Sequence, residues 1–454
     1  MKDKLAPGMI TPEEILLTEQ ALSFALSHGA DSARLTLNKS LLDLVAMRDG
    51  ELDRVSHSLD RSLQLSLFAD GRFGTFSINR LESKALEEFI LDALGTLKLL
   101  APDPLRSLPS PERTAKDAVT GLELDLYDPA YAEMDPSRRK ALAEKSTVWA
   151  RKASLEDGFT VISEEEEYSD SVFDTLLIDS LGTRCRHTET SFEIACDLTV
   201  QDPSGARYNA VWWDARPFLR DLDIDGVAEK AVRKAAEAIG PLPCGGGRMS
   251  VVVDTECASK LVTPLLNALG GFALQQKNSF MDSTLGLKVL GDNVTILDRP
   301  RSAGETGSRL FDSEGVATEE VPVIDGGVVK RYFLTTWTAA KLSMEPTCDD
   351  CIRPSIAPTG GCQDLEEILA DVGEGILITG FNGGNSNTST GEYSFGIEGF
   401  LFKNGRRVHP VREMVMTGDF RTLWNNLTHA GSDARECQAK QIPTLAFKNV
   451  EISG

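Results

Sequence analysis

The sequence predicts an α+β protein with two domains, and three observations support this. Within residues 1–240 the order helix, strands, helix occurs twice, which favours an antiparallel sheet with helices, built as a duplicated unit. The Pro- and Gly-rich stretch 241–247 is the strongest boundary signal in the chain. Over 248–454, short β segments alternate with Gly, Asn and Asp turns, which predicts a β-rich C-terminal domain.

The first repeat begins with a clearly marked helix. Thr11 is the candidate N-cap, Pro12 suits the first helical position, and Glu14 completes a capping box. Apolar residues then recur at helical spacing until Gly29, which is a natural stop.

Strands joined by tight hairpin turns follow this helix. Arg48-Asp49-Gly50 and Ala69-Asp70-Gly71 are typical of such turns, because glycine tolerates the positive φ that they require. The order α-β-β-β-β-α is expected, with strand character at 30–37, 42–47 and 62–68 and a second helix over about 83–100.

The second repeat follows a Pro-rich, acidic connection over 101–134. Its expected elements are a capped helix from Asp135-Pro136 to about 153, strands across 158–213 and a helix near 225–239. Beyond the boundary, helices are expected at about 256–269 and 364–372, with turns at Ile324-Asp325-Gly326-Gly327 and Lys403-Asn404-Gly405 among the β segments.

Composition restricts the class of protein. Acidic residues outnumber basic ones by 69 to 47, and a net charge of −22 repels phosphate backbones, so direct nucleic-acid binding is not expected. No stretch of about 18 apolar residues predicts a membrane helix. The N-terminal stretch MKDKLAPGMITPEE lacks the apolar segment of a secretory signal. A cytoplasmic protein is therefore expected, with its eight cysteines as reduced thiols.

One cysteine cluster resembles part of a metal site. Cys348 and Cys351 form a CxxC pair, and Cys362 follows. Zinc would need a fourth ligand, and no histidine lies within twenty residues; Cys437 could serve only if the fold brought it close. We interpret the cluster as reduced thiols in a loop, and the CxxC does not follow the βαβ pattern of a redox site.

Other catalytic motifs are absent from the sequence. No HExxH pair and no GxSxG elbow occurs. The Gly-rich stretches Gly245-Gly246-Gly247 and Gly383-Gly384-Asn385 do not continue into a phosphate-binding motif and are expected to be loops. The four carboxylates of Glu164 to Glu167 are expected on a solvated surface. No residue is predicted to be catalytic, to hold a metal or to bind a cofactor; the histidines considered are His28, His57, His187, His409 and His429.

A longer pattern is more informative. The segment Phe311-Asp312-Ser313-Glu314-Gly315-Val316-Ala317-Thr318 is followed by a turn at 325–327, the strand-like 328–334 and Thr338-Ala339-Ala340-Lys341-Leu342. This strongly resembles the PmbA/TldD family, also called modulators of DNA gyrase, in which an FDDEG-type turn precedes an NGVLKGYL-type strand and a TARKL-type helix. Further matches are at 48–51, 60–62, 70–74, 366–375, 404–405, 410–414 and 417–418.

The resemblance implies paired subunits that act as an intracellular peptidase on unfolded peptides. The TldD type carries a zinc-binding HExxxH helix and a later Cys ligand, whereas the PmbA (TldE) type lacks them. Here the matching helix is 256–269, and Thr263-Pro264-Leu265-Leu266-Asn267-Ala268 contains neither His nor Glu. Cys437 lies where the active type has its Cys ligand. The expected zinc is therefore in a TldD-like paralogue, with none in this chain.

The leading hypothesis is thus a non-catalytic subunit of a heteromeric metallopeptidase, homodimeric when isolated. A β-rich domain can hold an extended peptide by strand addition, which suits unfolded substrates. Asp312 and Glu314 are expected to be turn and loop residues, since Asp stabilises such turns through its own backbone. Two alternatives remain open: a regulator linked to DNA gyrase, and a homodimeric peptide-binding protein.

Overall fold

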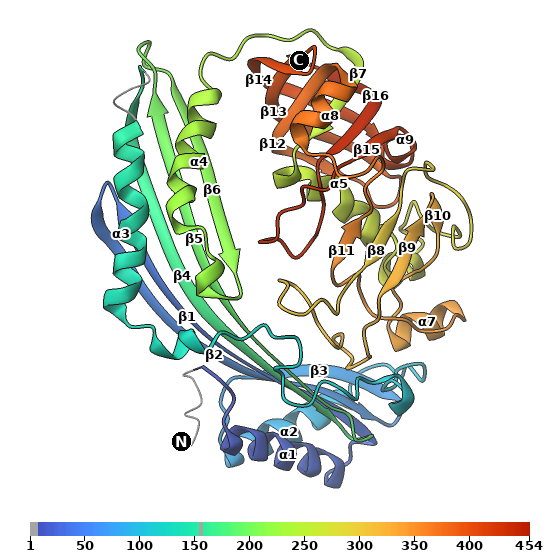
Figure 1. Ribbon diagram of the computed structural model, residues 1–454. Coiled ribbons are helices and arrows are strands. Elements are labelled where there is room, and N and C mark those ends of the chain that lie inside the picture. The colour runs from blue at the N-terminus through green and yellow to red at the C-terminus, as the bar shows by residue number, and fades with distance from the viewer. Residues whose placement is uncertain (1–7, 154–157) are drawn as a thin grey trace. The chain divides into compact units, whose positions relative to one another are not determined.

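The structure is a computed structural model that describes residues 8–153 and 158–454 (Figure 1). Part of the charged N-terminal stretch, residues 1–7, therefore lies outside the described residues. The chain forms two compact units. The first comprises Met1–Ala236 with Arg301–Thr318, and the second comprises Glu237–Pro300 with Glu319–Gly454. A segment from the C-terminal half of the sequence thus packs with the N-terminal unit.

The first unit is one six-stranded sheet in the order β3-β2-β1-β4-β5-β6, in which all neighbours pair antiparallel. The expected α+β class is confirmed, and the order helix, three strands, helix occurs twice, with β1 and β4 adjacent at the middle of the sheet. The elements are α1 (Pro12–Ser27), β1 (Ser32–Arg48), β2 (Glu51–Ala69), β3 (Arg72–Ile78), α2 (Ser83–Leu97), α3 (Pro136–Ala153), β4 (Thr160–Asp179), β5 (Arg184–Gln201), β6 (Arg207–Arg216) and α4 (Ile224–Glu237).

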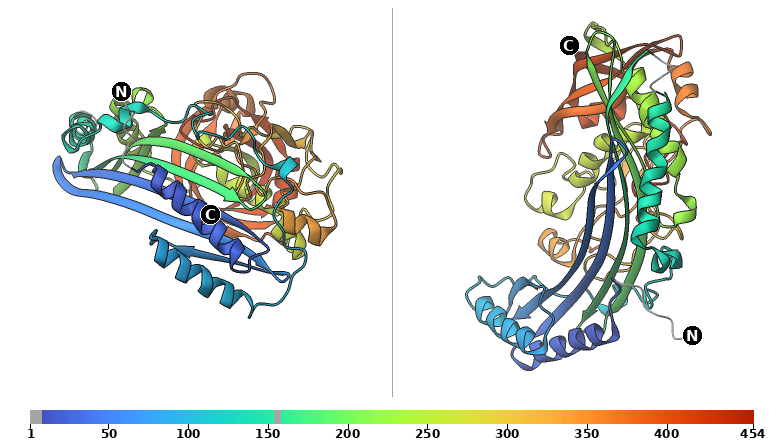
Figure 2. Two further views of the ribbon diagram at one scale, coloured as in Figure 1. Left: turned by 90° about the horizontal axis from the view of Figure 1, so that it is seen from below. Right: turned by 90° about the vertical axis from the view of Figure 1, so that its left-hand side faces the viewer.

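All four helices cover the same face of this sheet. Near one end, α1 and α2 pack on a core of alternate residues from β1 and β2, including Leu35, Leu37 and Leu65. Towards the other end, α3 packs on β4 and β1, and Arg139 of α3 bonds Asp170 of β4. Figure 2 shows the two helix pairs along the sheet. The alternation of buried residues follows from the two-residue period of a strand.

Two local predictions are confirmed at the start of the chain. The Thr11 side chain accepts a hydrogen bond from the backbone N–H of Glu14, whose carboxylate accepts from the N–H of Thr11, so the capping box is complete. Both expected hairpin turns have positive φ at their central residues, which are Asp49, Gly50, Asp70 and Gly71.

The expected separate strands at 30–37 and 42–47 are wrong, because β1 is continuous from Ser32 to Arg48. The polar residues between them have partners within the sheet. Lys39 donates to Glu14, and Asn38 accepts from Thr175. These contacts make the polar stretch compatible with an uninterrupted strand.

Residues 301–318, which we call the returning segment, pack on the opposite face of the sheet. The Pro-rich connection includes short 3₁₀ turns, Pro111–Arg113 and Pro129–Glu133. Ala115 N–H donates to the carbonyl of Gly315, and Ala317 N–H donates to that of Arg113. The Pro-rich connection and the returning segment share a small core with β4 and β5. Its members are Ala115, Ala118, Leu124, Leu126, Leu177, Cys185, Leu310 and Phe311.

The second unit is rich in β structure, as expected. Its larger sheet has the order β14-β13-β12-β7-β16-β15, and an additional β14–β16 pairing brings distant strands together like a barrel. Its smaller sheet has the order β10-β9-β8-β11. The strands are β7 (Gly247–Val253), β8 (Ile296–Asp298), β9 (Val321–Asp325), β10 (Val328–Val329), β11 (Pro354–Ile356), β12 (Glu374–Ser386), β13 (Glu392–Lys403), β14 (Arg406–Asp419), β15 (Leu427–Ala430) and β16 (Leu445–Ser453).

Helices cover both faces of the larger sheet. Leu261, Val262 and Leu265 of α5 enter the main core with Val251 and Val253 of β7. On the other face, α8 packs on a second cluster that includes the intervening Val252. The helices of this unit are α5 (Thr255–Ala268), α6 (Gly271–Gln275), α7 (Thr336–Leu342), α8 (Leu365–Val372) and α9 (Phe420–Asn425). Within the described residues, no helix is long and apolar enough to cross a membrane.

Candidate functional site

A groove in the second unit lies along helix α5. Its volume is about 460 Å³. One wall is the exposed side of α5, and the opposite wall comes from β12 and β13. The lining residues are Cys257, Ser259, Lys260, Thr263, Pro264, Phe381, Asn385, Ser386 and Phe395.

The β12 wall has an open strand edge. Strand β7 pairs with β12 only at 376–378, because β7 ends at Val253 and α5 begins at Thr255. From 380 to 386, β12 pairs with β13 on one side and has no strand neighbour on the other among the described residues. An open edge presents unpaired backbone N–H and C=O groups, and such groups bind an extended peptide. The groove therefore has the backbone geometry for strand addition.

The side chains of the groove are cationic, polar and aromatic. The Lys260 ammonium lies 5.3 Å from the centre of the Phe395 ring, a cation–π distance. Lys440 reaches α5 from a following loop and donates to the Thr263 hydroxyl at 2.7 Å. The same loop accepts a hydrogen bond from Thr255 at the carbonyl of Ile442. Lys260 of α5 and Lys440 of the loop thus lie on this side of the helix, and an ammonium group can bind a carboxylate or carbonyl oxygen.

The residues of this groove do not fit a zinc ion. Catalytic zinc takes three protein ligands from His, Asp, Glu or Cys, with a carboxylate as base. Of these residue types the groove offers only Cys257, whose thiol lies 3.5–3.6 Å from the carbonyls of Asp254 and Ile378. Across residues 8–153 and 158–454, no group of three His, Cys, Asp or Glu side chains is placed to hold a metal ion.

The cysteine cluster does not assemble into such a group. Cys348 and Cys351 are buried and Cys362 is exposed, and all three are reduced thiols. Burial, reinforced by the carboxylates of Asp298 and Asp350, raises the pKa of the Cys351 thiol. A thiol with a raised pKa is a poor nucleophile and a poor metal ligand. Cys437 is also buried.

The histidines lie on separate elements. His57 bonds Asp43 at 2.7 Å, and buried His187 bonds Glu189 at 3.1 Å. The remaining three follow α1 (His28) or lie in β14 (His409) and β15 (His429).

Two expectations for polar segments need correction. The prediction that Glu164 to Glu167 form a solvated surface is wrong for alternate members: Glu164 and Glu166 are buried, whereas Glu165 and Glu167 pair with Arg48 and Arg54. The four residues lie in β4, so their side chains alternate between the two faces.

The Gly383-Gly384-Asn385 stretch is also not a loop, because it lies within β12. Gly384 has φ +90°, and a Cβ there would lie 2.0 Å from the carbonyl oxygen of Ser394 on β13. Glycine is therefore required for these two strands to approach, at a position that lines the open edge.

The prediction for Asp312 as a turn residue is confirmed. Its Oδ1 accepts hydrogen bonds from the N–H groups of Glu314 and Val316, both at 2.9 Å. The Glu314 carboxylate lies 3.8 Å from the Arg34 guanidinium of β1. Both acidic residues are buried in the first unit, where Asp312 holds its own turn and Glu314 pairs with a residue of the sheet.

Sequence reasoning missed the groove residues of β12 and β13. Their signal is weak, because glycines and asparagines in a strand resemble a loop. One signal in the sequence could have indicated the groove. Pro264 lies inside an otherwise regular helix, and this proline removes one backbone N–H donor on the side of the helix that lines the groove.

Comparisons with known proteins agree along the chain. Three consecutive family profiles match: PmbA/TldA metallopeptidase domain 1 at 37–95, the central domain at 130–239 and the C-terminal domain at 246–454. Metalloprotease PmbA of Escherichia coli O157:H7 is 26% identical over 444 residues, which is 96% of each chain.

Solved structures give the same result. A Bacteroides thetaiotaomicron protein described as a modulator of DNA gyrase is 36% identical, with a TM-score of 0.92 over 98% of this chain and 100% of that one. TldE of Thermococcus kodakarensis has a TM-score of 0.81 over 96% of this chain and 100% of its own, and at 19% identity it shows similarity of fold.

Proposed function

This chain belongs to the PmbA/TldD metallopeptidase family, and from that premise we propose that it is the metal-free subunit of a TldD/TldE-type peptidase. In this proposal the chain binds unfolded peptides but does not hydrolyse them. A TldD-like paralogue supplies zinc, the zinc-bound water and the general base.

The observation that carries the proposal is the chemistry of α5. The family resemblance implies that α5 corresponds to the zinc helix of the active subunit, yet the α5 residues that line the groove are Cys257, Ser259, Lys260, Thr263 and Pro264. The lysine, the two hydroxyl residues and the proline neither bind zinc nor accept a proton from water at neutral pH, and Cys257 alone offers one of the three ligands that catalytic zinc takes. In this proposal the groove binds the substrate, and the residues for hydrolysis come from the paralogue.

The groove along α5 suits peptide binding. A peptide that pairs with the open edge of β12 gains main-chain hydrogen bonds without regard to its sequence. Phe381 and Phe395 offer apolar contact, and Lys260 offers a charge-assisted bond to a carbonyl or carboxylate. A groove of this kind admits extended chains and excludes folded proteins, because only an extended backbone can pair with a strand edge. The same groove also suits the alternative of a homodimeric peptide-binding protein, so the assay must include the paralogue.

The decisive experiment is a mixing assay. This chain, a zinc-bearing paralogue and an unstructured peptide are combined, and cleavage is compared with that by each protein alone. Cleavage is expected to be fastest in the mixture, and this chain alone is expected to give none. If the mixture cleaves no faster than the paralogue alone, the subunit role is wrong.

One variant tests the groove itself. Lys260→Glu is expected to raise the KM of the mixture about tenfold with little change in kcat, because it removes one charge-assisted bond that is present in bound substrate and transition state alike. The matched control is Lys403→Glu, the same charge reversal at an exposed hairpin residue outside the groove. Equal effects of the two variants would show that overall charge, and not the groove, governs binding.

A further inference from the structure

The groove along α5 has the opposite sign of charge to the chain as a whole. Among the described residues that line it, Lys260 is the one charged side chain, and none is an aspartate or a glutamate. The whole chain carries a net charge of −22. At physiological salt the Debye length is about 8 Å, so a peptide in the groove interacts more strongly with this lysine than with distant acidic residues.

The ammonium of Lys260 is held in place by an aromatic ring. Phe395 is 1% exposed, and its ring packs edge-on against that of Phe381 with the centroids 5.6 Å apart. The Lys260 ammonium lies 5.3 Å from the centre of the Phe395 ring, which attracts it through a cation–π contact. Within the described part of the chain, this ammonium has no carboxylate partner. Its N–H donors are therefore available to an incoming acceptor.

A second ammonium lies beside the first. The Thr263 hydroxyl donates to the carbonyl of Ser259 at 2.9 Å and accepts from Lys440 at 2.7 Å, so it positions Lys440 next to the groove. Residues three apart on a helix are neighbours on its surface, which brings Lys440 close to the Lys260 position. The charges of Lys440 and Asp350 interact, however. Lys260 is therefore the main candidate to bind a carboxylate, and Lys440 adds to the positive field.

Lys260 lies over the middle of the open edge. Its ring partner Phe395 pairs with Gly384 of β12, and the open edge extends from 380 to 386. The lane beside β12 is closed at Ile378, where β7 already pairs. A peptide paired with this edge would thus continue on both sides of Lys260. Because side chains of a strand alternate between its two faces, an internal side chain of the peptide would meet the ammonium.

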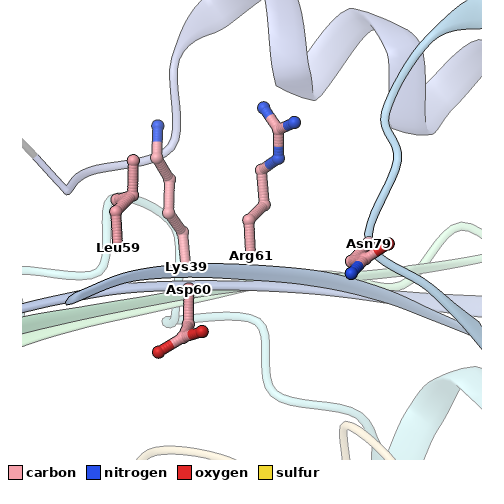
Figure 3. A pocket seen from close by; sticks show the side chains of 5 residues that line it. All are labelled: Lys39, Leu59, Asp60, Arg61 and Asn79. Carbon is pink, nitrogen blue, oxygen red and sulfur yellow. The ribbon is translucent and has the colours of Figure 1, made fainter.

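Another hollow with cationic side chains lacks this property. It lies in the first unit and has a volume of about 310 Å³ (Figure 3). Its lining residues are Lys39, Leu59, Asp60, Arg61 and Asn79. Figure 3 shows Lys39 and Arg61 on one side of the sheet and Asp60 on the other. Both cations already bind the carboxylate of Glu14, at 3.0 and 2.8 Å. A second carboxylate would have to compete with Glu14 there.

We propose that the groove selects extended peptides that carry an acidic side chain, and that Lys260 is the residue that determines this preference. Main-chain pairing with β12 gives affinity without regard to sequence. An ion pair with Lys260 adds selectivity at one position of the peptide. This inference rests on the peptide binding of the proposed function but not on hydrolysis, so its test uses neither the paralogue nor cleavage.

A peptide series tests the preference by direct binding to the full chain. Four unstructured peptides of one sequence carry a neutral dye, and binding is measured by fluorescence anisotropy at physiological salt. Three have an amidated C-terminus and carry glutamate, glutamine or lysine at the central position. The fourth carries glutamine and a free C-terminal carboxylate. The glutamate peptide is expected to bind about tenfold more tightly than the glutamine peptide, which corresponds to about 1.4 kcal/mol. The lysine peptide and the fourth peptide are expected to bind no more tightly than the glutamine peptide.

Variants of the groove assign the preference to one side chain. Lys260→Gln is expected to abolish the difference between the glutamate and glutamine peptides, because the ion pair is lost. Lys260→Glu is expected to make the lysine peptide the tightest of the four, because the charge is reversed. Lys403→Glu, the same reversal at an exposed residue outside the groove, is the matched control and is expected to keep the wild-type order.

The series on the wild-type protein gives a result whether or not a variant folds. Equal binding of the glutamate and glutamine peptides overturns the acidic preference but leaves peptide binding intact. If none of the four peptides binds, both the preference and the proposed role of the groove are wrong. A fourth peptide that binds as tightly as the glutamate peptide assigns the ammonium to the peptide end, which contradicts the proposal. An unchanged order of affinities in a folded Lys260→Glu variant also overturns it.

Discussion

Asp312 offers a sharp test of whether the strongest motif of the chain is structural or catalytic. Its carboxylate is only 4% exposed and accepts hydrogen bonds from two backbone N–H groups, both at 2.9 Å. Asp312→Ala leaves these two buried donors without the carboxylate, and each such loss costs about 1–3 kcal/mol. We therefore expect the free energy of unfolding of the first unit to fall by about 2–4 kcal/mol.

The assay is thermal unfolding followed by circular dichroism. For a unit of about 250 residues, 1 kcal/mol corresponds to a shift in Tm of about 2–4 °C, so the transition of the first unit should fall by about 5–15 °C. Asp312→Asn keeps an acceptor oxygen and should lower the Tm by only a few degrees. The control is Asp92→Ala, an exposed aspartate on α2, which should leave the Tm unchanged.

The result that would refute this reasoning combines stability with activity. If Asp312→Asn and Glu314→Gln leave the Tm and the assembly with the paralogue unchanged but abolish peptide cleavage in the mixture, these carboxylates contribute chemistry. If instead Tm and cleavage fall together, with activity recovered at lower temperature, they hold the returning segment in place.

Three further predictions follow from the charge and thiol chemistry of the chain. Elemental analysis of the purified protein should find far less than one zinc per chain; one zinc that is lost in a Cys348→Ala/Cys351→Ala variant would contradict our interpretation of the buried thiols. A gel-shift assay at physiological salt should give no DNA complex tighter than about micromolar, the tight end of non-specific binding, because the net charge is −22; a tighter complex would favour a role at DNA gyrase. Although burial opposes it, hydrogen bonds from Arg61, the Thr11 backbone and Lys39 lower the pKa of Glu14 below 4.5. The folded state therefore gains stability above that pH and loses it as the pH falls through the lowered value, so the difference in Tm between the wild type and Glu14→Gln should shrink below about pH 4.

Local signals in the sequence predicted the elements of the first unit well. The capping box at Thr11 and the hairpin turns at Asp49 and Asp70 act within a few residues, and each appears in the structure. The false break within β1 arose from long-range partners. Lys39 is tolerated in the strand because Glu14, far away in the sequence, lies above it. No local pattern could have indicated that pairing.

The candidate site was less predictable for the same reason. The sequence identified α5 as the helix to compare with the zinc helix, and it showed that residues 263–268 of that helix contain neither His nor Glu. It did not indicate that the edge of β12 beyond 378 is open, because this depends on where β7 ends in the folded sheet. Nor did it predict that residues 301–318 return to the first unit, since that requires the contacts of Ala115 and Ala317 across the fold.

The tightest resemblance to the family and the proposed function depend on different parts of the chain. The motif from Phe311 to Leu342 crosses from one compact unit to the other, since 301–318 belong to the first and 319–342 to the second. Asp312 and Gly315 serve the turn itself: the aspartate binds two N–H groups, and a Cβ on the glycine, at φ +83°, would lie 3.0 Å from Leu177. Such constraints apply to any member with this fold, whether or not it holds zinc. The motif therefore identifies the architecture, whereas the proposed role as a subunit that binds substrate without cleaving it depends on α5, where Lys260 and Thr263 line the groove.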